Sequence, residues 1–214
     1  MSNTDIKDKL DYKLWSTSVT RFNAAKRVES WKHCIRWSLL FTSIYLTILS
    51  VMLYSKKIQP GFDDLSQLMT IFLSILILCL SLAVNLNQLD RRATLYHECG
   101  RKIRRLLNQL GTASDDSALS NLSAEYDEIL DQYENHNSLD FYQFVINNTQ
   151  KLSEQQKKYI PKFYVLYIWF PAARFIPQII IYILTIFVPF ITIMYISTFK
   201  LTNKVRLCEE RTTI

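Results

Sequence analysis

The sequence predicts an all-α membrane protein: a two-helix transmembrane hairpin extended into a cytoplasmic helical stem, plus a C-terminal transmembrane helix. Residues 37–55 and 65–89 are strongly apolar and carry no charge. A helix needs about 20 such residues to cross a bilayer, and only helices and closed barrels satisfy their backbone there. Neither run alternates polar and apolar residues as a barrel strand does. Two spans are therefore expected at about 37–55 and 65–87.

The composition indicates long helices beside a membrane. The chain has 214 residues, of which three are glycine and five are proline, so few tight turns are expected. The net charge is +6, and the basic residues lie mainly beside the apolar runs, as in the cytoplasmic flanks of membrane helices. This placement argues against direct binding of nucleic acid. The scattered cysteines indicate no disulfide framework: they are Cys34, Cys79, Cys99 and Cys208.

Helices are predicted on both outer sides of the hairpin. Residues 5–36 are amphipathic, with apolar side chains every three or four positions. They are also polar and charged, so the first span is expected to direct insertion without a cleaved signal peptide. Residues 89–110 have apolar side chains at heptad spacing, which is typical of a helix packed along another. These positions are Tyr12, Trp15, Val19 and Phe22 in the first helix and Leu89, Tyr96, Cys99, Ile103, Leu106 and Leu110 in the second.

The charges place both outer ends of the hairpin in the cytoplasm. Lys and Arg are in excess before the first span and after the second. The charges of residues 56–64 cancel, and this loop contains the turn signal Pro60-Gly61. Because basic flanks remain on the cytoplasmic side, we expect a multi-pass protein of the inner (cytoplasmic) membrane with its N-terminus in the cytoplasm.

The two outer helices are predicted to pack together as a stem, which with the hairpin forms a first domain, residues 1–110. With the turn near residues 59–60, residues whose numbers add to about 120 should lie side by side. Two ion pairs follow from this register, Arg21 with Glu98 and Glu29 with Arg91 or Arg92. Exposed pairs contribute about 1 kcal/mol or less, so they would set the register more than the stability.

Residues 111–160 are predicted to form a cytoplasmic acidic helical region. Residues 111–117 have the composition of a helix breaker followed by an N-cap. Residues 118–140 contain six Asp or Glu and no Lys or Arg, and their apolar side chains share one face. We expect one helix here, packed against the basic stem and continued as far as a break near residues 147–148.

Residues 161–214 are predicted to contain an interfacial helix, a third span and a tail. Residues 163–173 are aromatic and too few to cross the bilayer, which favours an interfacial helix. Residues 175–199 are uncharged and form the third span, with a kink expected at Pro189. Lys and Arg lie on both sides of this span, so its direction stays open. A single crossing places the C-terminus outside, whereas a re-entrant path through residues 163–173 keeps it inside.

Few residues point to chemistry, and no catalytic, cofactor-binding or metal-binding residues are predicted. The sequence has no glycine-rich phosphate loop and no nucleophile motif. His33-Cys34 and His97-x-Cys99 resemble metal ligands, but in the stem they would lie about 16 Å apart at 1.5 Å per residue. His136 lies among acids, which favours a packed or surface histidine over a ligand. We therefore expect neither an enzyme nor a cofactor or metal.

Polar residues form one stripe along each of the first two spans. At 100° per residue the members of each polar stripe fall within about 60° of one another. The first polar stripe is Ser43, Thr47, Ser50 and Tyr54, and the second is Thr70, Ser74, Ser81 and Asn85. Such residues either pack helices together through hydrogen bonds or line a pore, with Asn85 near its cytoplasmic mouth. One hairpin cannot enclose water, so a pore would require a homo-oligomer.

Two short motifs resemble a known family. RFNAAKR, residues 21–27, stands before a two-helix hairpin and a basic helix, as in the SLATT domain (SMODS and SLOG-associating two-transmembrane effector domain). YDEILDQYENHNSLDFYQF, residues 126–144, and the third span are similar to the subfamily often encoded beside a reverse transcriptase. The resemblance covers residues 10–144 well. It implies a membrane effector of a prokaryotic antiviral or conflict system that works with a neighbouring sensor protein such as a reverse transcriptase.

The resemblance transfers motif positions but no catalytic residues. The first motif corresponds to Arg21, Asn23, Lys26 and Arg27, and the second to Glu134, Asn135, His136 and Asp140. In a stem helix, Ala24-Ala25 would permit close packing while Lys26 and Arg27 meet lipid headgroups. Asn135 and His136 could cap the acidic helix or contact a partner.

The predicted function is therefore that of a membrane effector in contact with lipid. When triggered, it would oligomerise into a pore or membrane lesion and cause growth arrest or cell death. The alternative is a membrane anchor or scaffold that recruits a cytosolic partner through its charged helices. A small transporter is disfavoured because no span contains an embedded charge of the kind that marks an ion path.

Overall fold

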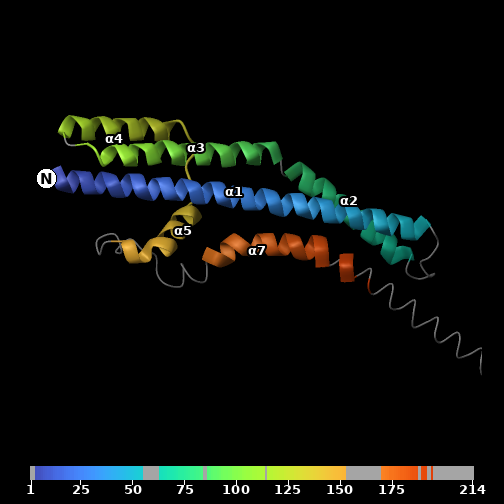
Figure 1. Ribbon diagram of the computed structural model, residues 1–214. Coiled ribbons are helices and arrows are strands. Elements are labelled where there is room, and N and C mark those ends of the chain that lie inside the picture. Colours follow the sequence, from blue (N-terminus) through green and yellow to red (C-terminus); the bar gives the residue numbers. More distant parts are fainter. Residues whose placement is uncertain are drawn as a thin grey trace, which may run out of the picture. The chain divides into compact units, whose positions relative to one another are not determined.

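The computed structural model describes residues 3–54, 63–83, 86–113, 115–152, 170–187, 189–191 and 194. Every regular element among them is a helix, so the predicted all-α fold is confirmed. Figure 1 shows the order of the elements. They are α1 (Asn3–Tyr54), α2 (Asp63–Ala83), α3 (Leu86–Leu110), α4 (Asp116–Asp131), α5 (Ser138–Asn148), the short 3-10 helix η1 (Thr149–Lys151), α7 (Phe170–Tyr182) and the π-helix η3 (Ile183–Phe187).

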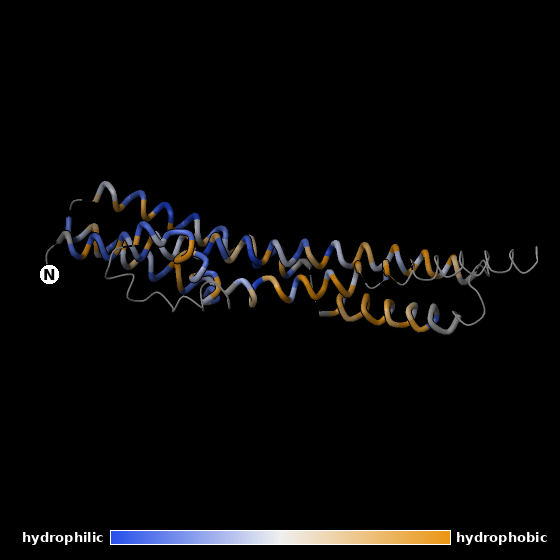
Figure 2. Tube along the Cα trace, turned by 90° about the horizontal axis from the view of Figure 1, so that it is seen from below, coloured by the Kyte–Doolittle hydropathy of each residue, from blue (hydrophilic) through white to orange (hydrophobic). Residues whose placement is uncertain are grey.

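The helices belong to two compact units. Unit 1 combines Met1–Lys32 with Leu86–Ile176, and unit 2 combines His33–Asn85 with Pro177–Ile214. Figure 2 shows that hydrophilic residues dominate the first half of α1, α3 and α4, whereas hydrophobic residues dominate the second half of α1, α2 and α7. The polarity of the chain therefore changes along α1.

The predicted register of the stem is confirmed. α1 is unbroken over its 52 residues, and α3 packs along it in the opposite direction. In three contacts between the two segments the residue numbers add to between 119 and 122. The contacts are Lys7 with the Ala113 carbonyl (3.0 Å), the Phe22 ring with the His97 ring (centroids 5.3 Å apart) and Lys32 with Asp90 (2.5 Å).

The two ion pairs predicted from that register are wrong. Arg21 donates to the backbone carbonyl of Glu134 and not to Glu98. Arg92 pairs with the carboxylate of Glu134 and not with Glu29. Both arginines bind the segment between α4 and α5, because that segment covers the stem and offers a carbonyl and a carboxylate.

The core of unit 1 lies where α3 packs against both α1 and α4. The heptad positions predicted on α3 are buried, except Leu89, which is partly buried. Full burial of one such side chain contributes about 1.5–3 kcal/mol, so this cluster holds the three helices together. Its buried members are Leu10, Leu14, Cys99, Ile103, Leu106, Leu110, Leu119, Leu122, Tyr126 and Ile129.

The single acidic helix predicted over residues 118–140 is wrong, because the chain forms two helices there. α4 ends at Asp131 and α5 begins at Ser138. Just before α5, the Asn137 side chain accepts from a backbone N–H of the first turn, and the Asp140 carboxylate accepts from the Asn137 backbone N–H (3.2 Å). This capping box stabilises a new helix start. The end of α5 at Asn148 agrees with the break predicted near residues 147–148.

Among the described residues, two helical segments are long and apolar enough to cross a membrane, Asp5–Met52 within α1 and Pro171–Ile191. The apolar part of α2, Gln67–Leu82, is shorter within the described residues. These segments overlap the three predicted spans. The predicted turn at residues 60–61, residues 163–169 of the predicted interfacial helix and residues 195–199 of the third span lie outside the described residues.

In unit 2, α1 contacts the third apolar segment through small polar side chains that the sequence analysis did not single out. Thr185 Oγ1 donates to Ser38 Oγ (3.3 Å), and both side chains are fully buried. Thr42, one turn further along α1, is buried beside them. Small hydroxyl residues let two helices approach closely. Thr185 lies in η3, one turn before Pro189, where a π-helical turn accommodates a residue that cannot donate to the helix.

Candidate functional site

The two motif segments that the sequence analysis treated separately are in contact in unit 1. Residues 21–27 form about two turns of α1, and residues 134–140 form the connection between α4 and α5 together with the first turn of α5. Side chains of the first segment bind backbone and side-chain groups of the second. We call this contact region the junction.

The strongest contact of the junction is a buried ion pair. Arg27 donates from Nε and Nη2 to the two oxygens of Asp140 at 2.8 and 2.9 Å, and the Asp140 side chain has no exposed surface. The same carboxylate caps α5, and the Asn23 side chain donates to the Asp140 backbone carbonyl (3.2 Å). A two-point arginine–carboxylate contact fixes geometry as well as charge. Asp140 therefore links the start of α5 to α1.

Arg21 is the second cation of the junction and is almost fully buried. Its guanidinium donates to the Glu134 backbone carbonyl and lies 5.9 Å from the centre of the Tyr96 ring. Its Nε is buried and has no hydrogen-bond partner among the described residues. Tyr96 donates its hydroxyl hydrogen to the Asn135 carbonyl (3.2 Å). A buried charge that is only partly satisfied is costly, so its neighbours must hold it in place.

His136 is partly buried beside this cation. Its backbone N–H donates to the Asn135 side chain (3.1 Å), and its ring Nδ1 is buried without a partner among the described residues. Burial lowers the pKa of His136 and the charge of Arg21 lowers it further, while Asp140 opposes the shift. The imidazole is therefore held in its neutral form.

The junction should consequently weaken in mild acid. The unfolded chain binds a proton at His136 near the ordinary pKa of 6.5, and the folded chain binds it only at lower pH. Stability due to this group is therefore present above pH 6.5 and is lost as the pH falls toward the folded value. We expect the thermal midpoint of the full chain to fall more between pH 7.5 and 5.5 than that of His136→Gln. Equal falls in the two proteins would contradict this assignment.

The rim of the junction is exposed. Arg92 pairs with the Glu134 carboxylate (2.9 Å), and both side chains are about half exposed or more. An exposed pair of this kind adds little stability. Arg174, near the start of α7, donates to the Gln143 side chain (3.0 Å) in a partly buried contact.

Seven of the eight predicted motif residues meet at the junction. The exception is Lys26, which is exposed and makes none of these contacts. Of the two alternatives for Asn135 and His136, capping of the acidic helix is wrong, because Asp115 and Gln132 are the caps of α4 and Asn137 is the cap of α5. The spacing of Asn137 and Asp140 is a capping-box signature that could have been recognised in the sequence. Tyr96 carried no comparable signal, because it had been assigned to the heptad pattern.

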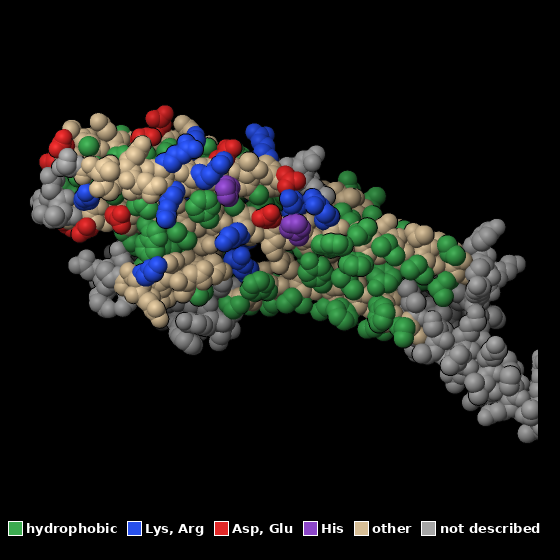
Figure 3. Space-filling model, viewed as in Figure 1, with side chains coloured by type: hydrophobic (Ala, Val, Ile, Leu, Met, Phe, Trp, Pro, Cys, Tyr) green, Lys and Arg blue, Asp and Glu red, His purple; other side chains and the backbone are tan. Residues whose placement is uncertain are grey.

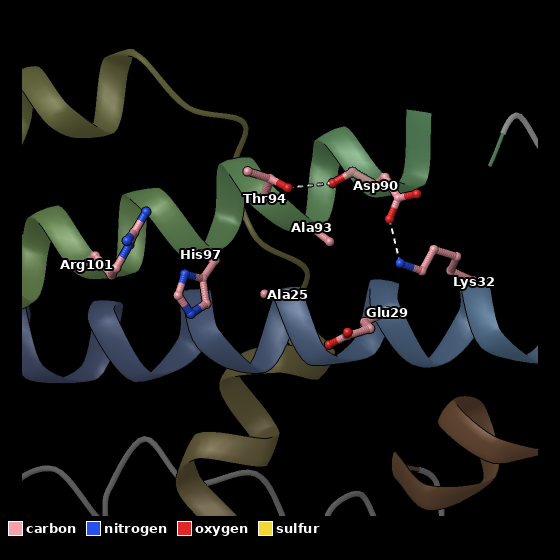
Figure 4. Close-up of a pocket in the computed structure, with 8 residues that line it drawn as sticks. All are labelled: Ala25, Glu29, Lys32, Asp90, Ala93, Thr94, His97 and Arg101. Carbon is pink, nitrogen blue, oxygen red and sulfur yellow. Dashed lines mark hydrogen bonds and ion pairs between the residues drawn. The ribbon is translucent and has the colours of Figure 1, made fainter. Parts of the chain in front are cut away.

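A groove of about 440 Å³ lies between α1 and α3 (Figure 4). Small side chains, Ala25 and Ala93, leave it open, and the Lys32–Asp90 ion pair closes one end. The lining carries charges of both signs. In the part of the chain that the structure describes, no three His, Cys, Asp or Glu side chains gather as metal ligands. The groove therefore selects no particular ligand charge.

The polar stripes lie in unit 2, and most of their described members are exposed. On α1, Ser43, Thr47 and Ser50 are exposed. On α2, Ser74 and Ser81 are exposed and Thr70 is half-buried, whereas Asn85 and the side chain of Tyr54 lie outside the described residues. Four of these five exposed hydroxyls, those of Thr47, Ser50, Ser74 and Ser81, donate to carbonyls three or four residues earlier in their own helices. These donors therefore do not join α1 to α2.

The model of the SMODS and SLOG-associating 2TM effector domain family 5 matches residues 3–195 of the chain. This range includes both motif segments and all three apolar segments. No curated protein and no solved structure matches the chain.

Proposed function

The chain belongs to the SMODS and SLOG-associating 2TM effector domain family, which makes it a membrane effector of conflict systems, and from this membership we propose how it acts. When triggered, it assembles in the cytoplasmic membrane of a prokaryotic cell into a homo-oligomeric pore or lesion. The resulting leak arrests growth or kills the cell as an antiviral, abortive response. The N-terminus faces the cytoplasm, where an upstream sensor such as a reverse transcriptase acts on the stem.

The observation that carries the proposal is the three-way division of the surface of α1 in unit 2. One face is buried, around Ser38, Thr42 and Leu49. A second face is exposed and apolar, as lipid contact requires; its members are Trp37, Leu40, Ile44, Ile48 and Val51. The polar stripe lies between these two, about 120° from the buried face at 100° per residue. It is therefore neither packed in the protomer nor apolar enough for lipid.

α2 has the same arrangement. Leu73 is buried, and the polar stripe lies about 100° away from it on the helix at 100° per residue. A separate exposed face is apolar: Leu68, Ile71, Ile75, Leu78 and Leu82. Exposed hydroxyl faces on two helices suit contact with other copies or with water. Several copies are needed to enclose a pore, since two helices cannot surround one.

α1 offers a direct route from the trigger to the membrane. It is one unbroken helix that carries Arg21 and Arg27 of the junction and, further along, the first polar stripe. A partner that competes for the exposed Glu134 carboxylate would release Arg92 of α3 and would pull on the residue whose backbone carbonyl accepts from Arg21 of α1. Such a change at the stem could then alter how copies of the hairpin associate.

The proposal is tested by removing the hydroxyls of one stripe. Induced expression of the wild-type protein, with its neighbouring genes present and triggered, should depolarise bacterial cells, and the purified protein should release dye from vesicles. Ser43→Leu, Thr47→Leu and Ser50→Leu together should abolish both effects, because they extend the lipid face over the stripe. The matched control is Ile44→Leu with Ile48→Leu, which changes exposed positions of the same helix but keeps them apolar. Leakage by the stripe variant equal to the wild type would refute a pore lined by this face.

A membrane scaffold is the second candidate, and the exposed rim of the junction favours it. A cytosolic partner could bind Glu134 and Asn135 without any change in the membrane. This function predicts no leakage in either assay. It also predicts loss of activity in Glu134→Lys while the stripe variant remains active.

A further inference from the structure

Unit 1 has two exposed charged faces of opposite sign. The basic face consists of Arg101, Arg104 and Arg105 on α3, and the acidic face consists of Glu125, Glu128 and Asp131 on α4. None of these six forms an ion pair within the described residues, although Lys13 pairs with Asp127 and Arg92 with Glu134 nearby. In Figure 3 acidic side chains gather over α4, and Lys and Arg side chains over α3.

The two faces cannot neutralise each other within one chain. α3 and α4 pack through Ile103, Leu106 and Leu110 on one side and Leu119, Leu122 and Tyr126 on the other. At 100° per residue, Arg101 and Arg105 point about 150° away from the α4-facing side of α3. Glu128 and Asp131 likewise point about 150° away from the α3-facing side of α4. The apolar contact that joins the helices therefore turns both faces outward.

Each face also carries internal repulsion. Along α3, Arg101 is three residues from Arg104 and four from Arg105, and along α4 the successive acids Glu125, Glu128 and Asp131 are three residues apart. Like charges at these spacings are neighbours on a helix surface and destabilise it. A surface of opposite charge would relieve both repulsions. Ala124 and Ser120, which are small and exposed beside the acids, would allow a second helix to approach.

We propose that the basic face of α3 in one copy binds the acidic face of α4 in a neighbouring copy. The inference rests on the proposed oligomeric effector and identifies the contact through which its copies associate. Because the two faces differ, every copy uses both, and the contact is head-to-tail. Contacts of this type close into rings or continue as chains, as an oligomeric assembly requires.

A second copy suits these faces better than a nucleic acid or an anionic lipid surface does. A polyanion would bind the basic face alone and would leave the acids of α4 unpaired. A second copy neutralises both faces at once. Individual exposed ion pairs are weak and are screened over about 8 Å at physiological salt. The contact therefore forms only when copies are concentrated, as they are in the plane of a membrane.

Charge reversal of each face tests the contact in the full-length chain. One variant carries Arg101→Glu, Arg104→Glu and Arg105→Glu, and the other carries Glu125→Lys, Glu128→Lys and Asp131→Lys. Association is measured by energy transfer between donor-labelled and acceptor-labelled copies in vesicles. Each variant alone should associate roughly tenfold more weakly than the wild type. The matched control replaces the same three arginines with lysine, keeps the charge, and should associate like the wild type.

Mixing the two charge-reversed variants is the decisive experiment. The reversed α3 of one then faces the reversed α4 of the other, and the two unchanged faces also match, so energy transfer should return to the wild-type level. High salt should weaken all of these associations. Unchanged helicity and thermal midpoints would show that the variants are folded.

Three outcomes would overturn the contact: association of both single variants at the wild-type level, loss in the α3 variant alone, or no recovery on mixing. Loss in the α3 variant alone would indicate a polyanionic ligand instead. Dye release separates this inference from the proposed function. Association without release refutes the pore and leaves the contact, whereas release by variants that do not associate refutes the contact and leaves the pore.

Discussion

Asp140→Asn is expected to destabilise unit 1 by about 3 kcal/mol, because it leaves Arg27 without a counter-charge in a largely buried site. The Arg27 side chain is 18% exposed and that of Asp140 is 0% exposed, so water cannot replace the lost interaction. The substitution keeps the size of the side chain, which confines the effect to charge and hydrogen bonding. The measurement is the thermal midpoint of the full chain in detergent, together with hydrogen exchange of the amides of α5.

The matched control is Glu134→Gln in the same segment. The side chains of Glu134 and Arg92 are 63% and 46% exposed, so loss of this pair should cost less than about 1 kcal/mol. A double variant, Arg27→Met with Asp140→Leu, should be less destabilised than Asp140→Asn, because it leaves no unpaired charge. Equal midpoints for Asp140→Asn and Glu134→Gln would show that the ion pair does not hold α5 on α1.

Gly100→Leu is expected to separate α1 from α3 and to cost about 2–3 kcal/mol, whereas Gly100→Ala should be nearly neutral. A Cβ atom at Gly100 would lie 3.1–3.3 Å from three atoms of the Phe22 ring, so one methyl group requires only a small shift of that ring. Alanine also gains about 1 kcal/mol of helix propensity over glycine. Leucine has no such space, and Ser18 donates to the Gly100 carbonyl (3.3 Å), which keeps the two helices close.

Thermal midpoints of the three proteins measure this difference. Adding Phe22→Ala to Gly100→Leu should recover part of the loss, because the removed ring makes room for the leucine. If leucine and alanine at Gly100 gave the same midpoint, the close approach of α1 and α3 at this residue would not limit stability.

Much of the stem could be predicted from the sequence because its helices and their register depend on local residue patterns. The heptad positions of α3, such as Ile103 and Leu106, identify a helix that buries one face. The turn near residues 59–60 then sets which residues of α1 lie opposite. Both arguments need only helix geometry, and contacts such as Phe22 with His97 follow the predicted register. The two predicted ion pairs are wrong because a third segment of the chain competes for the same arginines.

The junction could not be assembled from the sequence. Its residues were singled out as two motifs, but Arg27 and Asp140 are 113 positions apart and no periodicity relates them. The break between α4 and α5 was missed because an acidic run with one apolar face favours a single helix. The reciprocal cap of Asn137 and Asp140 outweighs that preference once Arg27 holds the carboxylate in place.

By itself the sequence determined that this is a helical membrane protein, which residues enter the apolar spans and how the stem helices align. These properties depend on local charge, hydropathy and helical period. Only the tertiary structure decided that the two motifs bind each other, that Ser38 contacts Thr185, and that most of the described polar-stripe residues stay exposed. Each of these depends on which faces of distant helices are already occupied, and that is settled by packing of the whole chain.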